Sequence, residues 1–198
     1  GLYSLFAAAC VGPAGRVIAV EPSSREVARL RANLKLNPRL RVDVEQVGLS
    51  RAPGEALVNV ASATHAGHNT LGTFAYEGID AAQPERITLT TLDHLAGRLD
   101  HVDLIKIDVE GAELAVLEGA VQTLQRHRPV ILFELLDTAL KQQGASADGV
   151  LAFLTGLGYQ FLVLDDATGR FVPQAAPDQR SENKVAIQHG RPRHDAAP

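Results

Sequence analysis

The 198-residue sequence contains one cysteine, Cys10, and no methionine or tryptophan. A single cysteine excludes an internal disulfide framework and fits a reducing compartment, so we expect a cytoplasmic protein. Cys10 lies in the apolar stretch 5–11, which favours a buried structural thiol over a reactive one. No apolar run approaches the ~20 residues that a bilayer-spanning helix needs. The formal net charge of −4 gives no reason to expect nucleic acid or a membrane as a partner.

Composition indicates one ordinary globular domain. Apolar residues make up 45% of the chain and charged residues 21%, and the length suffices to bury a substantial core. We expect one domain over residues 1–190, followed by a polar, disordered tail over residues 191–198. Because the chain starts with Gly1 and lacks methionine, we interpret it as a fragment whose N-terminal part has been removed.

Apolar patterning predicts strands that alternate with helices. Ser23 and Glu26 resemble a capping box that opens one of the helices, and the long polar segment 61–86 indicates a functional insertion that shapes a substrate pocket. Alternating strands and helices with strands buried on both faces predict an α/β fold with an open, mostly parallel sheet and helices on both faces. The predicted helices are 2–11, 23–37, 114–124 and 147–157, and the predicted strands are 16–20, 41–49, 55–60, 87–92, 102–107, 129–134, 159–164 and 184–188.

Carboxylates end three of the predicted strands. Glu21, Asp108 and Glu134 should therefore point toward one rim, where ligands of open α/β sheets collect. Glu21 lies twenty residues after Gly1. In nucleotide-binding folds, an acid about 20 residues after the glycine-rich turn accepts hydrogen bonds from both hydroxyls of the ribose. The alternative is an acidic residue that favours the start of a helix.

A second acid and a glycine follow Asp108 directly. Asp108 and Glu110 could bind a cation, hold an ammonium group or take a substrate proton, and Gly111 would allow a sharp turn beside a ligand. Alternatively, Glu110 and Glu113 merely occupy the first turn of a helix. The spacing leaves both interpretations open.

Two histidines and one lysine complete the candidates. His68 is a candidate general base near neutral pH, and His65 a weaker one; their spacing without a third ligand makes a metal site a poor fit. Lys106 is unusual in a strand buried on both faces, and we expect it to pair with an acid or to reach the rim.

Five stretches together, GLYSLFAA, GRVIAVEPS, LRANLKLN, DLIKIDVEGAELAVLEGA and RPVILFEL, resemble the FkbM family of S-adenosylmethionine-dependent methyltransferases. The resemblance covers nearly the whole chain, and KIDVEGAE followed by LEGA is its most specific part. It implies a class I methyltransferase fold, which is Rossmann-like with a reversed last strand, and methyl transfer to a hydroxyl oxygen of a small acceptor such as a sugar or a polyketide-type product.

The resemblance also implies roles for individual residues. Glu21, with Pro22 beside it, would hold the cofactor's ribose, and Asp108 would lie between cofactor and substrate. His68, Asp108 and Glu110 are the candidates for the catalytic residues, with Glu134 shaping the site; no metal is required. The remaining cofactor-binding candidates are Gly1, Tyr3 and Ser4 for the methionine part, and Gln46 and Val47 for adenine.

The sequence departs from the family pattern at its start. The first motif of the family reads roughly D-x-G-A-N-x-G-x-Y-S, and this chain begins at its last glycine, Gly1. The first strand is therefore missing from the chain, which would leave two unpaired strand edges and weaken cofactor binding. Two alternative functions remain: a nicotinamide-dependent oxidoreductase, since an acid after the second strand also serves NAD, and a non-catalytic binding domain that has lost its cofactor loop.

Overall fold

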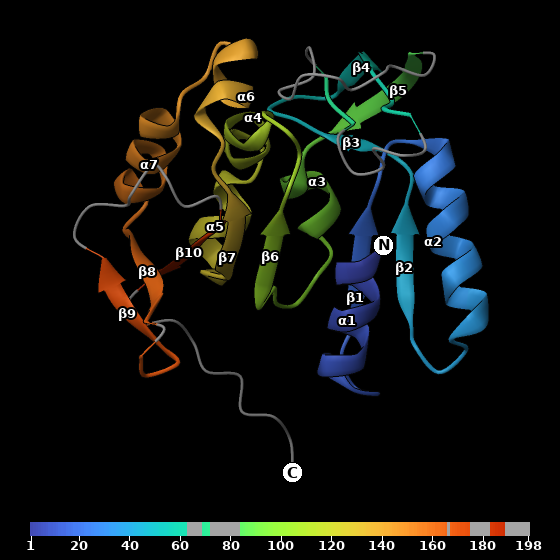
Figure 1. Cartoon of the computed structure of the whole chain (residues 1–198), viewed down its shortest axis with the longest axis horizontal. Coiled ribbons are helices and arrows are strands. Elements are labelled where there is room, and N and C mark those ends of the chain that lie inside the picture. The colour runs from blue at the N-terminus through green and yellow to red at the C-terminus, as the bar shows by residue number, and fades with distance from the viewer. Residues whose placement is uncertain (63–68, 72–83, 166, 175–182, 189–198) are drawn as a thin grey trace.

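A computed structural model describes residues 1–62, 69–71, 84–165, 167–174 and 183–188 (Figure 1). Its helices are α1 (Leu2–Val11), α2 (Ser24–Leu36), α3 (Leu92–Ala96), α4 (Glu113–Glu118), α5 (Val121–His127), α6 (Asp137–Gln142) and α7 (Ala147–Gly156). Its strands are β1 (Val17–Val20), β2 (Val42–Glu45), β3 (Gly48–Leu49), β4 (Gly54–Val58), β5 (Glu85–Thr90), β6 (Leu104–Ile107), β7 (Val130–Glu134), β8 (Tyr159–Asp165), β9 (Arg170–Gln174) and β10 (Asn183–Gln188). No helix in these ranges is long and apolar enough to cross a membrane.

The strands form three sheets. β1 and β2 pair in parallel, a five-stranded sheet has the order β6-β7-β10-β8-β9, and a small sheet has the order β3-β5-β4. β1 and β6 are each the end strand of a sheet, and among the described strands each has one edge without a hydrogen-bonded neighbour. Both strands point the same way (Figure 1).

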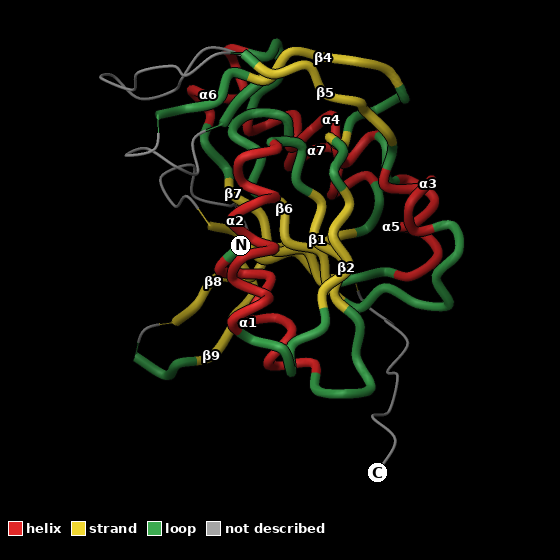
Figure 2. The backbone as a smooth tube through the Cα atoms, turned by 90° about the vertical axis from the view of Figure 1, so that its right-hand side faces the viewer, coloured by secondary structure: helices red, strands yellow, loops and turns green. Residues whose placement is uncertain are grey.

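The fold is mixed α/β, and helices lie on both sides of the central strands. Figure 2 shows α1 and α2 on one side, and α3 and α5 on the other. The prediction of a mostly parallel sheet is not confirmed, because β10 runs antiparallel to both β7 and β8, and the β8–β9 and β4–β5 pairs are antiparallel as well. The parallel pairs are β1–β2, β3–β5 and β6–β7.

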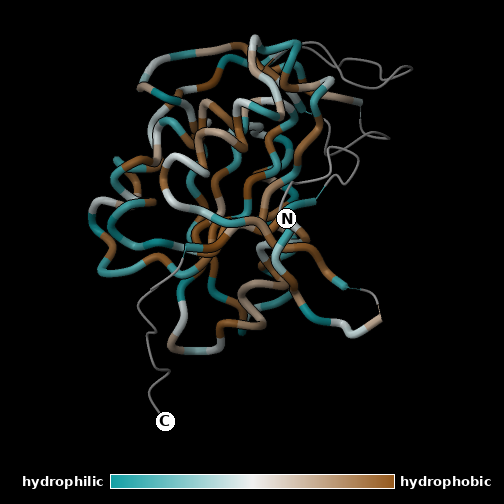
Figure 3. Tube along the Cα trace, turned by 90° about the vertical axis from the view of Figure 1, so that its left-hand side faces the viewer, coloured by the Kyte–Doolittle hydropathy of each residue, from teal (hydrophilic) through white to brown (hydrophobic). Residues whose placement is uncertain are grey.

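The main core lies between the five-stranded sheet and helices α4, α5 and α7. Ile131 and Phe133, which alternate along β7, are fully buried, as are Leu124 of α5 and Leu154 of α7. Strand alternation places every second β7 side chain on this face. In Figure 3, hydrophobic segments of the trace concentrate in the middle of the molecule. This core fixes the ends of β6 and β7, on which the candidate site is built.

Two predicted elements are each divided in two. The strand predicted over 41–49 becomes β2 and β3 in different sheets. The helix predicted over 114–124 becomes α4 and α5, which meet at Gly119 and Ala120. The apolar pattern does not predict the short helices α3 and α6 or the strand β9. The tail predicted to be disordered lies outside the described residues.

Two local expectations are wrong. Cys10 is exposed rather than buried, because it lies on an outward face of α1. The capping box does not form, although Ser23 is the N-cap of α2: its side chain makes no capping bond, and Glu26 pairs with Arg25 at 2.7 Å instead. The Ser24 amide donates to the Glu85 carboxylate at 3.0 Å. An acid of β5, distant in sequence, therefore accepts a hydrogen bond from a free amide in the first turn of α2.

Candidate active site

Carboxyl groups meet where β6 and β7 end. The parallel register pairs Ile107 with Phe133, so Asp108 and Glu134 are the next residues on neighbouring strands. Adjacent strands lie ~4.8 Å apart, and side chains in register point to the same side. Carboxylate oxygens of Asp108, Glu110 and Glu134 all lie within 4.8 Å of one another. The structure thus brings together two predicted catalytic residues and the predicted shaping residue.

The pKa of the Glu134 carboxyl group is strongly raised in this group. Its pKa is raised to about 8, chiefly by burial. A hydrogen bond with Asp108 and the negative charges of Asp108 and Glu110 raise it further, while the positive charge of Lys106 lowers it by a smaller amount. Two carboxyl groups this close cannot both ionise easily, so the pair retains one proton. A pair that holds a proton near neutral pH can take up or release one during a reaction. The three acids also offer enough oxygen donors for a divalent cation.

Lys106 links this acidic group to α1. Its Nζ lies 2.8 Å from Asp108 Oδ2 and 4.6 Å from the centroid of the Tyr3 ring, and its side chain is only 15% exposed. The expectation that Lys106 pairs with an acid is confirmed. The ammonium group stabilises the ionised Asp108, and its position over the aromatic face adds a cation–π contact to Tyr3. Tyr3, a predicted cofactor residue, therefore belongs to the same face as Asp108.

The turn that carries Glu110 has an unusual backbone. Glu110 adopts φ +50° and Gly111 φ +104°, a region that favours glycine. A Cβ on Gly111 would lie 2.5 Å from the Ala139 carbonyl oxygen, so this turn approaches α6 closely. The prediction that Gly111 permits a sharp turn is therefore confirmed.

Three residues that the sequence analysis did not assign to the site hold this turn. Glu113 is buried, and its Oε1 accepts hydrogen bonds from the amides of Val109 and Gly111. Thr70 and Gln143 donate to the Glu110 carbonyl oxygen at 3.0 and 3.1 Å. The sequence places Glu113 only in the first turn of a helix. Thr70 and Gln143 carry no local signal, because their partner is distant in sequence.

Glu21 ends β1 on the same rim. Its amide donates to the Glu45 carbonyl of β2 at 3.0 Å, and its Oε1 accepts from the Ser23 amide at 2.9 Å. Burial raises the pKa of Glu21, with a smaller contribution from Glu26. Among the described residues, Oε2 has no hydrogen-bond donor. A half-buried carboxylate with one oxygen free can accept further hydrogen bonds from a bound hydroxyl.

The other predicted binding residues are spread around this rim. Gly1 begins α1, where an added Cβ would lie 2.6 Å from Leu30 Cδ1, so α1 and α2 pack closely there. Among the described residues, no hydrogen bond or ion pair joins Glu21 to Asp108. Ser4 and Pro22 are partly exposed. In the link between β2 and β3, Val47 is partly exposed and Gln46 is exposed. His65 and His68 lie outside the described residues, so the structure does not test the predicted histidine base.

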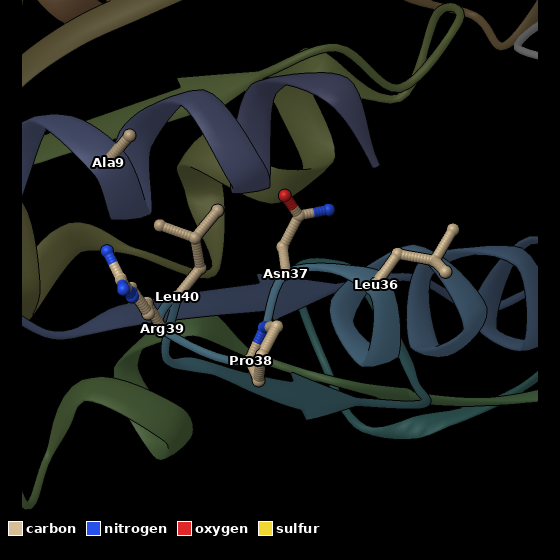
Figure 4. A pocket seen from close by; sticks show the side chains of 6 residues that line it. All are labelled: Ala9, Leu36, Asn37, Pro38, Arg39 and Leu40. Atoms are coloured by element: carbon tan, nitrogen blue, oxygen red, sulfur yellow. The ribbon is translucent and has the colours of Figure 1, made fainter.

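An open pocket of about 460 Å³ lies elsewhere. Figure 4 shows Ala9 of α1 facing the turn between α2 and β2. This turn precedes β2, so the pocket is at the opposite end of the strands from the carboxyl rim and is not part of the candidate site. Its lining residues are Ala9, Leu36, Asn37, Pro38, Arg39 and Leu40.

Comparisons with known proteins identify relatives of the chain. A family model described as the methyltransferase FkbM domain matches residues 1–161. The crystal structure of methyltransferase FkbM from Methylobacillus flagellatus KT has a similar fold, with a TM-score of 0.50 and 16% sequence identity. The similarity covers 87% of this chain and 36% of that one, so this chain spans about a third of that protein. A search of curated proteins found no match.

Proposed function

Because this chain belongs to the FkbM methyltransferase family, we propose that it transfers a methyl group from S-adenosylmethionine to a hydroxyl oxygen of a small molecule. The observation that supports this most directly is the rim itself. Glu21 at the end of β1 and the Asp108–Glu134 pair at the ends of β6 and β7 stand where nucleotide-like ligands bind in open α/β sheets. We also propose the class I, Rossmann-like architecture, with β2-β1 and β6-β7-β10-β8 as its two parts.

The residues at the rim fit the cofactor chemically. Glu21 keeps one oxygen for a ribose hydroxyl, and its partial burial strengthens hydrogen bonds to the carboxylate. Gly1, Tyr3 and Ser4 would approach the methionine part, while Gln46 and Val47 would lie near the adenine. When bound, S-adenosylmethionine supplies a methyl group activated by a positively charged sulfur. The acidic character of the rim suits that charge.

The protein's own contribution is alignment and proton removal. A hydroxyl must lose its proton as the new oxygen–carbon bond forms. Asp108 forms an ion pair with Lys106, and the Asp108–Glu134 pair holds one proton near neutral pH. We assign to this pair the removal of the acceptor's proton, with Glu110 shaping the same surface. His68 remains an alternative base. The segment over residues 61–86 is proposed to shape the acceptor pocket, which would be specific for small molecules rather than nucleic acid.

The test is calorimetry with the full-length protein, its Glu21→Gln variant and a Glu118→Gln control. Glu118 is the last residue of α4 and pairs with Arg51. We expect S-adenosylmethionine to bind the parent and the control alike. Losing a charged acceptor of a hydroxyl hydrogen bond should weaken binding by ~1–3 kcal/mol in Glu21→Gln. If the parent binds NAD and not S-adenosylmethionine, the proposal is wrong.

A further inference from the structure

The Val109–Gly111 turn is a backbone conformation that must be held in place. Glu110 is a non-glycine residue at φ +50°, and Gly111 follows at φ +104°. Left-handed conformations of non-glycine residues are unfavourable and persist only where surrounding contacts enforce them. The turn also carries the side chain that meets Asp108 and Glu134. Whatever holds the turn therefore sets the geometry of the acidic group.

Glu113 holds the turn from the side of its amides. Its Oε1 accepts from the Val109 amide at 3.4 Å and from the Gly111 amide at 3.2 Å. The residue is 2% exposed, and its Oε2 is buried with no hydrogen-bond partner in the described chain. Burial raises the pKa of its carboxyl group above the usual value. A helix-start acid that only favoured the dipole would keep its carboxylate in water, where desolvation costs nothing.

The opposite side of the turn is held by two further elements. The Glu110 carbonyl oxygen accepts from Thr70 Oγ1 at 3.0 Å and from Gln143 Nε2 at 3.1 Å. Thr70 precedes β5 and Gln143 follows α6, so segments far apart in sequence converge on one peptide group. The Val109 and Gly111 amides and the Glu110 carbonyl are thereby each paired within the protein. Each contact orients the backbone of Glu110 without touching its carboxylate.

We propose that Glu113 is a positioning residue, which keeps the Glu110 carboxylate against Asp108 and Glu134 by binding the amides of the turn. A role of this placement in catalysis rests on the proposed function. The position of Glu110 beside Asp108 and Glu134 does not depend on it. Glu110 contributes to the electrostatic environment of Glu134, together with burial, Asp108 and Lys106. Glu113 binds the amides of the turn through its Oε1, so we expect it to act on Glu134 through the turn. Releasing the turn should move Glu110 away and make Glu134 a stronger acid.

The experiment is a ¹³C NMR titration of the Glu134 carboxyl group in protein labelled at glutamate, without cofactor or acceptor. The variants are Glu113→Ala, Glu113→Gln and the control Glu118→Ala, which alters the same helix at its other end. We expect Glu113→Ala to lower the Glu134 midpoint by about half a pH unit, a roughly threefold loss of proton affinity. Glu113→Gln keeps an oxygen acceptor for the two amides and should restore the parent midpoint, as should the control.

Two outcomes would overturn the proposal. A folded Glu113→Ala protein with the parent midpoint would show that Glu113 does not place Glu110. Equal displacement in Glu113→Ala and Glu113→Gln would show that its charge, and not its hydrogen bonds, matters. If Glu113→Ala does not fold, Thr70→Val removes one donor to the Glu110 carbonyl with little change in shape; its midpoint must also fall, and a parent-like value counts against the proposal. Because no ligand is used, these results are independent of whether S-adenosylmethionine binds.

Discussion

The shared proton of Asp108 and Glu134 makes stability depend on pH in a defined direction. In the folded protein the pKa of Glu134 rises from its ordinary value of 4.5 to about 8. Between these two pH values the folded chain holds a proton that the unfolded chain has released. Stability therefore falls as pH rises through this window, and the loss is complete above pH 8. Below the ordinary value both states are protonated and the group contributes no difference.

The magnitude follows from the size of the pKa change. Raising a pKa from 4.5 to about 8 corresponds to ~5 kcal/mol if none of the interaction is screened. Glu134 is only partly buried, and solvent screens charges at such positions strongly. We therefore expect about 1–2 kcal/mol. Glu134→Gln should remove this penalty, because an amide can donate to Asp108 as the protonated carboxyl group does but cannot ionise.

The assay is urea unfolding of parent and Glu134→Gln proteins at several values between about pH 5 and pH 9. The two proteins should have similar free energies of unfolding at the acidic end. The variant should become the more stable one by about 1–2 kcal/mol at the alkaline end. Glu55→Gln, which alters an exposed acid paired with Arg86, should show no such trend. A difference between Glu134→Gln and the parent that is the same at every pH would refute the reasoning.

Three further predictions concern the scaffold and its surface. Gly111→Ala should destabilise the protein by about 2–4 kcal/mol in urea unfolding, because the new Cβ would meet the Ala139 carbonyl at a positive φ; an effect below about 1 kcal/mol would contradict the geometry of the turn. Asp93 accepts hydrogen bonds from the Thr123 amide and hydroxyl at the start of α5, each at 2.7 Å. Asp93→Ala should therefore lower the stability measured by thermal unfolding by ~1–2 kcal/mol. An unchanged unfolding midpoint would exclude this capping role. Exposed Cys10 should react with a thiol reagent in the native protein as fast as in urea, and reaction only after unfolding would show that it is covered.

Apolar periodicity predicts most elements of this chain but not where they are interrupted. The helix predicted over residues 2–11 and the strand over 129–134 match α1 and β7 almost residue for residue. The pattern over 114–124 continues across Gly119, although the helix does not. A Cβ on Gly119 would lie 2.1 Å from the Ser50 carbonyl oxygen. The break thus depends on a close contact between two segments some seventy residues apart, which no local pattern records.

In the candidate site, too, some features follow from the local sequence and others depend on contacts between residues far apart in the chain. That Asp108 and Glu134 reach one rim follows from their positions at strand ends, and the sequence predicts it. That they share a proton depends on the register of β6 on β7, since a shift of one residue would turn one carboxylate to the other face. Glu110 and Glu113 are both acids at the start of a helix, so local rules assign them one role. Burial separates them: Glu110 meets the acidic group, while Glu113 turns inward to hold the backbone that presents it. An acid near a catalytic motif is therefore best assigned by what its oxygens contact, and here only one of the two can touch a substrate.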